Sequence, residues 1–354
     1  MRKVSIGYYA HHHGSGHVSR ALQIGRFLDH PPTLFSSAPL PDHDASHVTF
    51  CRLDPDTGNA LANPTPHGLH YAPTGLRGIV ERTGRMVDWF RAQWPCVLVV
   101  DVSVEVALLA RLCAVPTILI RQNGIRTDAP HRLAYDSAVA LLAPFPAALG
   151  AKPEDDAWGG KTVFTGFISR YSTPARTLPA APNTVSVLIG HGGTMVTLAD
   201  LCAAARATPA WRWSVLGPIA PDSAVSCPAN LDLLGIVPDP AEHLRRAQIV
   251  VGSAGDNVVA EMAYLRCRYI ALSEPRPFDE QILTAQTLER LGLALHCPDW
   301  PVAPAWPALL QRASALDASG WNAFTAQSGA ETAARAIQAI SDQAWKHGIE
   351  NRQS

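Results

Sequence analysis

Three glycine-rich loops carry the residues of this sequence best suited to binding an anionic ligand. They span residues 13–17 (His-Gly-Ser-Gly-His), 190–194 (Gly-His-Gly-Gly-Thr) and 252–256 (Gly-Ser-Ala-Gly-Asp). Each follows a short apolar run and precedes a segment of helical period. A helix N-terminus carries partial positive charge and unpaired N–H groups, and glycine lets backbone approach a phosphate closely. One such turn is as common in packing as in binding, but three of them predict a shared phosphate-bearing ligand.

The segments around these loops alternate apolar runs with stretches of helical period, which is typical of βαβ units in parallel sheets. In the first half we expect strands near residues 4–8, 33–36, 97–101, 117–121 and 138–142, and a helix over 17–28. In the second half we expect strands near 185–189, 213–216, 249–252 and 269–272, and helices over 195–206 and 278–291. Asp239 and Pro240 are expected to begin a further helix. The stretch 167–183, with three prolines, predicts the boundary between two α/β domains.

Composition narrows the class of protein. The 354 residues suffice for two domains, and 47% hydrophobic residues provide material for two cores. Lys and Arg number 29 against 30 Asp and Glu, which argues against a nucleic-acid partner. Seven cysteines without a Cys-x-x-Cys pair argue against a disulfide framework and a zinc site. The N-terminal segment is too short and polar for a signal peptide and no long apolar run follows, so we expect a cytoplasmic protein.

Two segments together resemble a known family. The first is Gly-x-Gly-His-x-x-Arg-Ala at Gly14, Gly16, His17, Arg20 and Ala21; the second is residues 252–263, followed by Asp279-Glu280-Gln281 and Ala285. They resemble glycosyltransferase family 28, the family of the UDP-N-acetylglucosamine transferase of peptidoglycan synthesis. The resemblance covers most of the chain and is densest at residues 1–28, 185–200 and 235–295.

The resemblance implies a GT-B fold, in which two Rossmann-like α/β domains face a cleft. Residues 1–168 would meet the acceptor, and residues 183–329 would bind the nucleotide sugar, for which the resemblance implies a UDP-linked donor. A C-terminal helix over 330–347 would pack back on the first domain. The resemblance implies neither a metal nor a cofactor, because helix ends and backbone amides neutralise the diphosphate instead.

Several donor-side residues match the family pattern. Glu261 would accept hydrogen bonds from the ribose hydroxyls, Gln281 with Glu280 beside it would contact the donor sugar, and Gly255 with Asp256 would form the phosphate-side turn. Arg170 would add a phosphate contact, and Gly192, Gly193 and Thr194 would offer groups to the diphosphate. Plainer alternatives are a surface glutamate for Glu261, a solvated helix residue for Gln281 and a linker charge for Arg170.

The sequence also departs from the family on this side. Glu280 and Thr284 stand where members often have His and Asn, and Ser253 and Val258 stand where some relatives have Arg and Thr. These departures leave the identity of the donor sugar open, and with it a role as a non-catalytic sugar-nucleotide sensor.

His17 is the candidate catalytic base, because direct transfer with inversion needs a group that takes the proton of the acceptor hydroxyl. Asp101, at a strand end, is the alternative base or the partner that orients His17. The plainer alternatives are a histidine that orients its loop or donates to a phosphate, and an aspartate that caps a helix. His11, His12 and His13 are adjacent in a turn and so point different ways, which argues against a metal site. His67, His70 and His131 are left with no role beyond acceptor contacts.

Three functions remain open from the sequence. The first is transfer of a sugar to an acceptor that the sequence does not identify. The second is hydrolysis, because residues 14–20 also resemble the nucleotide-sugar hydrolases of nonulosonic-acid synthesis; the third is the sensor. Residues 79–94 combine apolar and arginine side chains, which is compatible with peripheral membrane contact but more typical of an amphipathic helix packed on its own core.

Overall fold

A computed structural model describes residues 3–12, 16–40, 45–61, 64–150, 156–171, 180–190 and 192–350, with side chains described up to residue 346. The chain divides into two compact units. The first contains Met1–Arg121, Arg126–Ile168 and Gly329–Ser354, and the second contains Gln122–Ile125 and Ser169–Ser328. Gly14, one of the expected phosphate-loop residues, lies outside the described residues.

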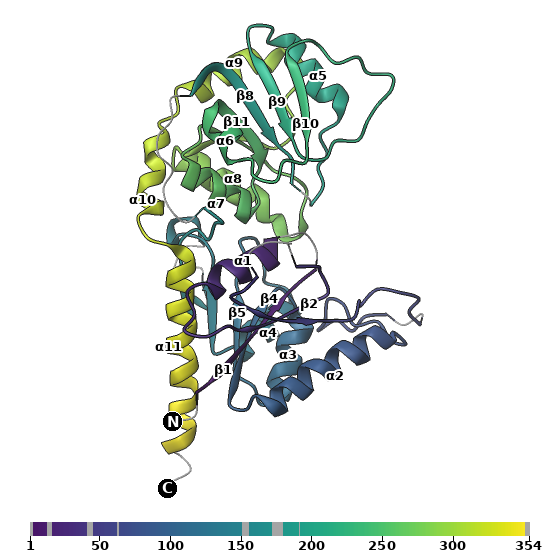
Figure 1. The fold of residues 1–354 in the computed structure, drawn as a ribbon, viewed down its shortest axis with the longest axis vertical. Coiled ribbons are helices and arrows are strands. Elements are labelled where there is room, and N and C mark those ends of the chain that lie inside the picture. The colour runs from purple at the N-terminus through teal and green to yellow at the C-terminus, as the bar shows by residue number, and fades with distance from the viewer. Residues whose placement is uncertain are drawn as a thin grey trace. The chain divides into compact units, whose positions relative to one another are not determined.

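The first unit is a parallel sheet with helices on both faces (Figure 1). Its described strands are β1 (Ser5–Ala10), β2 (Thr33–Ser36), β3 (Thr49–Arg52), β4 (Cys96–Asp101), β5 (Thr117–Ile120), β6 (Ala140–Ala143) and β7 (Thr162–Phe164). They are arranged in the order β3-β2-β1-β4-β5-β6-β7. The helices are α1 (Gly16–Gly25), α2 (Arg77–Ala92), α3 (Val104–Leu112), α4 (Ala129–Ser137) and α11 (Gly329–Glu350). Strand order reverses after β1, as in a Rossmann fold, so ligands are expected at the carboxyl ends of β1 and β4.

Two apolar cores cover the two faces of this sheet. On one face, α1 and α11 contribute Leu22 and Ile337 to a cluster that includes Val97 of β4. On the other face, Met86 of α2 and Ala107 of α3 pack against alternate residues of the same strands. Alternation of side chains along each strand explains how both faces are apolar.

The helix α11 returns the chain to the first unit from the second. It contacts α1 and buries Ala330, Ala333, Ala334 and Ile337, which recur at helical spacing (Figure 1). Its first residue is Gly329, where an added Cβ would lie 2.2 Å from the carbonyl oxygen of Phe167. Only glycine lets the helix start this close to that backbone.

The amphipathic segment 79–94 is α2, and most of its apolar face belongs to the core. Met86 and Phe90 are 1% and 3% exposed, whereas Val80 is 70% exposed. Core packing therefore accounts for the buried positions of this helix, as the plainer alternative expected. Among the described residues, no helix is both long and apolar enough to cross a membrane.

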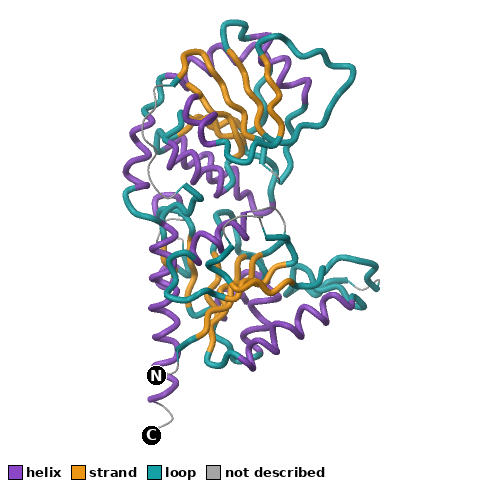
Figure 2. Tube along the Cα trace, in the orientation of Figure 1, coloured by secondary structure: helices purple, strands orange, loops and turns teal. Residues whose placement is uncertain are grey.

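The second unit repeats the scheme with a smaller sheet (Figure 2). Its described strands are β8 (Ala181–Leu188), β9 (Arg212–Leu216), β10 (Leu231–Gly235), β11 (Ala247–Ser253), β12 (Tyr269–Leu272) and β13 (Ala294–Cys297), in the order β10-β9-β8-β11-β12-β13. Its helices are α5 (Leu198–Ala207), α6 (Ala241–Arg246), α7 (Asp256–Leu265), α8 (Glu280–Arg290), α9 (Trp306–Ser314) and α10 (Asn322–Thr325). Order reverses after β8, so the Rossmann-like arrangement expected of each half is confirmed.

Two helices of the second unit begin later than the sequence analysis expected. The helix expected from residue 195 begins at Leu198, because Thr197 and Asp200 form a capping box that fixes its start. The helix expected from residue 278 begins at Glu280, because Phe278 and Asp279 have left-handed backbone with φ of 65° and 54°. The start of α6 is also shifted by one residue: Pro240, expected as the first helical residue, is the N-cap in place of Asp239, whose side chain still accepts a hydrogen bond from the backbone N–H of Ala241 at 3.1 Å.

Candidate active site

The carboxyl ends of β1 and β4 bring together the two residues expected to act as base and partner. Ala10 and Asp101, the last residues of these strands, are register partners. The helix that follows β1, α1, begins at Gly16, which places His17 in its first turn. His17 Nδ1 lies 2.8 Å from Asp101 Oδ1.

Asp101 is completely buried, and each of its oxygens has a partner. Arg20 Nη1 donates to Oδ1 at 2.8 Å and to Oδ2 at 3.1 Å, and the Tyr8 hydroxyl donates to Oδ2 at 2.9 Å. Burial alone would raise the pKa of Asp101, but Arg20, His17 and Tyr8 together hold it below the usual value. Burial and the charge of Asp101 raise the pKa of Tyr8, so its phenol stays a neutral donor.

This arrangement excludes one alternative for Asp101. The N-cap of α3 is Ser103, whose hydroxyl accepts from the backbone N–H of Val106 at 3.2 Å, so Asp101 does not cap that helix. Val102, between the two, has φ of 65°, which is a strained conformation for a β-branched residue. Such strain tends to persist where surrounding structure holds a functional group in place.

The pairing assigns the two nitrogens of His17. With Asp101 ionised, Nδ1 carries the proton and donates to the carboxylate, which leaves Nε2 as an acceptor. The His17 side chain is 15% exposed. Chemically, the pair can accept a proton at Nε2 and stabilise the resulting imidazolium through Asp101.

A cavity of about 340 Å³ lies in the first unit near this pair. His11 and His12, which follow β1, are among its lining residues. The His11 ring is 6.2 Å from the His17 ring, edge to face, and it stacks on His12 at 4.5 Å.

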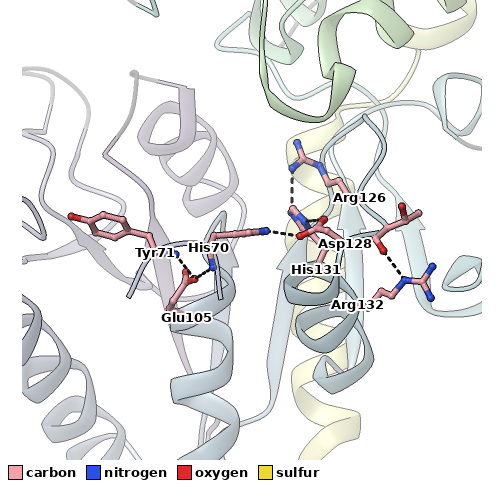
Figure 3. A network of polar contacts seen from close by, with 8 residues as sticks. His70, Tyr71, Glu105, Arg126, Asp128, His131 and Arg132 are labelled. Atoms are coloured by element: carbon pink, nitrogen blue, oxygen red, sulfur yellow. Dashed lines mark hydrogen bonds and ion pairs between the residues drawn. The ribbon is translucent and has the colours of Figure 1, made fainter. Parts of the chain in front are cut away.

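A second polar network lies at the start of α4 (Figure 3). Asp128 Oδ1 lies 2.6 Å from His131 Nδ1, and Asp128 Oδ2 lies 2.6 Å from His70 Nε2. Arg126 Nη1 lies 3.2 Å from His131 Nε2. The pKa of His131 is lowered to about 4, because burial and the nearby charge of Arg126 outweigh the opposing effect of Asp128.

The histidines of this network were left without a definite role by the sequence analysis. Ligand atoms of His70, Asp128 and His131 lie within 4.8 Å of one another, as in a metal site. A metal on His131 Nδ1 would move the proton to Nε2, which would then face the N–H donor of Arg126. The contacts therefore fit a hydrogen-bonded chain from Arg126 through His131 and Asp128 to His70 better than a metal site.

In the second unit, the third loop leads directly into a helix. Gly255 is the N-cap of α7 and Asp256 its first residue. A Cβ on Gly255 would lie 3.4 Å from Nε2 of Gln281, so the Gln281 amide lies against this turn. Gln281 is 5% exposed, and its Oε1 accepts from the backbone N–H of Glu274 at 3.1 Å. The alternative of a solvated helix residue is therefore wrong for Gln281, whereas Glu280 beside it is half-buried.

Glu261 and Arg170 form an ion pair. Arg170 Nε lies 2.8 Å from Glu261 Oε1, and the Glu261 side chain is 13% exposed. Burial raises the pKa of Glu261 above its usual value, and Arg170 opposes the shift. Arg170 therefore is not an isolated linker charge, and Glu261 is not an ordinary surface glutamate.

The second loop differs from the expected helix terminus. Four residues separate Gly193 from the first residue of α5, so its N–H groups are not those of the helix end. Arg276 Nη2 donates to the carbonyl oxygens of Gly192 and Gly193 at 2.9 and 3.3 Å. The Thr194 hydroxyl donates to the Glu274 carboxylate, which also accepts from the Met195 N–H at 3.1 Å. The Thr194 hydroxyl is therefore already bonded within the protein. The positive charge beside the second loop comes from the Arg276 guanidinium, which the loop carbonyls hold in place.

Solved structures give the fold of the whole chain. The glycotransferase of kitacinnamycin matches with a TM-score of 0.66 and 17% identity, covering 96% of this chain and 100% of that one. Acinetobacter baumannii MurG matches with a TM-score of 0.62 and 15% identity, covering 96% and 99%. The chain has the GT-B fold. LpCGTa, solved in complex with UDP, matches with a TM-score of 0.62 and 14% identity, covering 96% and 99%.

The GT-B fold implied by the family resemblance is thereby confirmed, as the fold alone. No family model and no curated protein matches the sequence.

Within the GT-B fold, Glu274 and Arg276 are the candidate site residues that sequence reasoning missed. Glu274 is 6% exposed although it carries a charge, and it follows β12 at the carboxyl edge of the sheet. The sequence Ser273-Glu274-Pro275-Arg276 directly after an apolar strand was the available signal, because charged residues at such strand ends are frequent at ligand sites. Their partners in the second loop could not be found from spacing.

Proposed function

We propose that the protein is a metal-independent glycosyltransferase that moves a sugar from a UDP-linked donor to a hydroxyl group of an acceptor, with inversion of the anomeric centre. The observation that carries this proposal is the pairing of His17 with buried, ionised Asp101 at the carboxyl edge of the first sheet. A histidine oriented by a carboxylate is suited to general-base catalysis.

The proposed transfer is a single displacement. Nε2 of His17 takes the proton of the acceptor hydroxyl as the acceptor oxygen forms a bond to the anomeric carbon. The bond from that carbon to the diphosphate oxygen breaks, and its electron pair leaves with the nucleoside diphosphate. Attack from the face opposite the leaving group inverts the anomeric centre.

On the donor side we propose that the second unit binds the nucleotide sugar. The start of α7 at Gly255 and Asp256 would receive the diphosphate, with Arg276 supplying positive charge from beside Gly192 and Gly193. Glu261 would accept from the ribose hydroxyls, with Arg170 holding its carboxylate, and Gln281 with Glu280 would contact the sugar. One neighbour is solved with UDP and another, the spinosyn rhamnosyltransferase SpnG, with thymidine diphosphate, which supports a nucleoside diphosphate as the leaving group; the choice of UDP rests on the family resemblance.

A panel assay tests this function. UDP-, TDP- and GDP-linked sugars are incubated with the protein, with and without hydroxylated acceptors, and nucleotide release and sugar products are measured in the presence of a chelator. We expect nucleotide release that depends on an acceptor and survives the chelator. Rapid release of free sugar without acceptor would establish a hydrolase instead. Binding without turnover across the panel would establish a sensor.

A further inference from the structure

The cavity of the first unit has walls that are largely apolar. It lies between α2, α3 and the chain that precedes α2, and its volume of about 340 Å³ is at the lower end of small-molecule sites. Its apolar and aromatic walls are formed by Tyr9, Tyr71, Ile79, Met86, Val106 and Leu109. Binding of an apolar ligand to such walls is favourable, because it removes apolar surface from water.

The charged groups on its walls are already paired within the protein. Arg82, which is 4% exposed, forms an ion pair with Asp56 and donates to the Tyr9 hydroxyl at 2.9 Å. Burial raises the pKa of Tyr9 to about 12, so it stays uncharged. A ligand anion would have to compete with Asp56 for Arg82, and breaking a buried ion pair is costly.

Glu105 adds a negative charge whose oxygens are also committed. Its Oε1 accepts from the backbone N–H groups of His70 and Tyr71 at 2.7 and 3.0 Å, and Oε2 accepts from the Ser103 hydroxyl at 3.0 Å. With the lining histidines His11 and His12 neutral, the charges on the cavity walls sum to one negative charge, with Arg82 as the cation and Asp56 and Glu105 as the anions. This balance disfavours an anionic ligand.

One wall is held in place by contacts that do not involve a ligand (Figure 3). The Tyr71 hydroxyl donates to the Asp56 carbonyl at 2.7 Å, and the neighbouring His70 is bonded to Asp128 at the start of α4. A pre-formed cavity favours rigid ligands, because little is lost in ordering either partner.

Part of the cavity lining lies close to the proposed base. His12 lines the cavity, His11 stacks on His12, and the His11 ring contacts the His17 ring edge to face. The lining residue His11 therefore lies 6.2 Å, ring centroid to ring centroid, from His17, and this is the end of the cavity at which we expect the hydroxyl group of a bound ring compound.

We propose that this cavity is the acceptor site and that it selects an uncharged, rigid, largely apolar ring compound that carries a hydroxyl group. This inference rests on the proposed transferase function for the role of acceptor, but the ligand class follows from the cavity alone.

Calorimetry with two matched probes tests the ligand class. We expect 2-naphthol to bind at least tenfold more tightly than 6-hydroxy-2-naphthoate, which differs by one carboxylate. Thr83, on the cavity wall, supplies variants: Thr83→Trp should fill the space and weaken 2-naphthol binding at least tenfold, whereas Thr83→Val should not. Ile79→Trp, from the same wall, serves as a second filling variant. Thermal melting confirms that each variant is folded.

Equal binding of both probes, or unchanged 2-naphthol binding in both folded Trp variants, would overturn the inference. UDP binding and UDP-sugar turnover are measured on the same samples. Cavity-dependent 2-naphthol binding without turnover of any nucleotide sugar would refute the transferase and leave the ligand class standing. Turnover that uses only anionic acceptors would refute the ligand class and leave the transferase standing.

Discussion

At the scale of single residues, His17 and Asp101 have different environments although they share a hydrogen bond. Asp101 is completely buried among Arg20, Tyr8 and His17, whereas part of the His17 ring is accessible. The buried carboxylate is thus suited to orienting and the imidazole to exchanging a proton. This division could be anticipated from residue types at a strand end and a helix start, but the bonds from Arg20 and Tyr8 could not.

We predict that His17→Ala lowers kcat by about 10²–10⁴-fold, the usual contribution of a general base. The nucleotide Kd should stay within about twofold, because the proposed nucleotide contacts lie in the second unit. Steady-state kinetics and calorimetry with UDP measure the two quantities. Ser19→Ala, on the same helix, is the matched control. Full turnover in the His17 variant would remove this residue from the mechanism.

Glu261 gives a second prediction at this scale. Glu261→Ala should weaken UDP binding by about tenfold or more, because hydrogen bonds to a charged group contribute about 1.5–3 kcal/mol. Wild-type protein should bind UDP more tightly than 2′-deoxy-UDP, and the variant should lose that preference.

Arg170→Ala separates this role from a structural one. It breaks the ion pair but keeps the carboxylate, so the preference for the ribose hydroxyl should persist. If both variants lose the preference equally, Glu261 acts only as the partner of Arg170. Glu242→Ala, an exposed glutamate of α6, is the control.

At the scale of elements, the start of α4 is built from groups that protonate at different pH. Burial would raise the pKa of Asp128, but its hydrogen bonds with His70 and His131 lower it to about 2, while the pKa of His131 is lowered to about 4. An unfolded histidine titrates near about 6.5. Between about pH 4 and about pH 6.5 the unfolded chain binds a proton at His131 that the folded protein does not. The unfolding free energy therefore falls as the pH falls through this window.

We therefore predict that, through His131, the unfolding free energy falls by on the order of 3 kcal/mol as the pH falls from about 6.5 to about 4. Above about pH 6.5 this residue causes no such loss. His131→Gln should flatten this part of the pH dependence, measured by chemical denaturation at each pH. An NMR titration of the imidazole provides an independent check. A His131 resonance that titrates near pH 6.5 would contradict the prediction.

The strands that the sequence analysis missed share a position in the fold. The strands β3, β7, β10 and β13 are the four edges of the two sheets. Edge strands are short and bonded on one side, so they lack the continuous apolar runs by which β1, β4, β8 and β11 could be predicted. Helix starts were missed where a local device decides them, as the capping box at Thr197 does for α5.

At the scale of the whole molecule, the chain leaves its first unit and later comes back to complete it. Ile337 is completely buried in the core that α11 shares with α1. We predict that Ile337→Ala lowers the unfolding free energy by about 2–5 kcal/mol, as for other buried truncations. UDP affinity should be unaffected in the folded variant. Chemical denaturation measures the loss, and Gln338→Ala on the next position is the control.

The return of α11 also constrains how the protein is made. During translation, residues 1–168 emerge from the ribosome long before residues 329–350 are synthesised. Until then, the nascent chain exposes the apolar surface of α1 and β1 that α11 later covers. The second unit, by contrast, is contiguous apart from Gln122–Ile125 and can be assembled during translation. The half of the molecule synthesised first is therefore the half that is finished last.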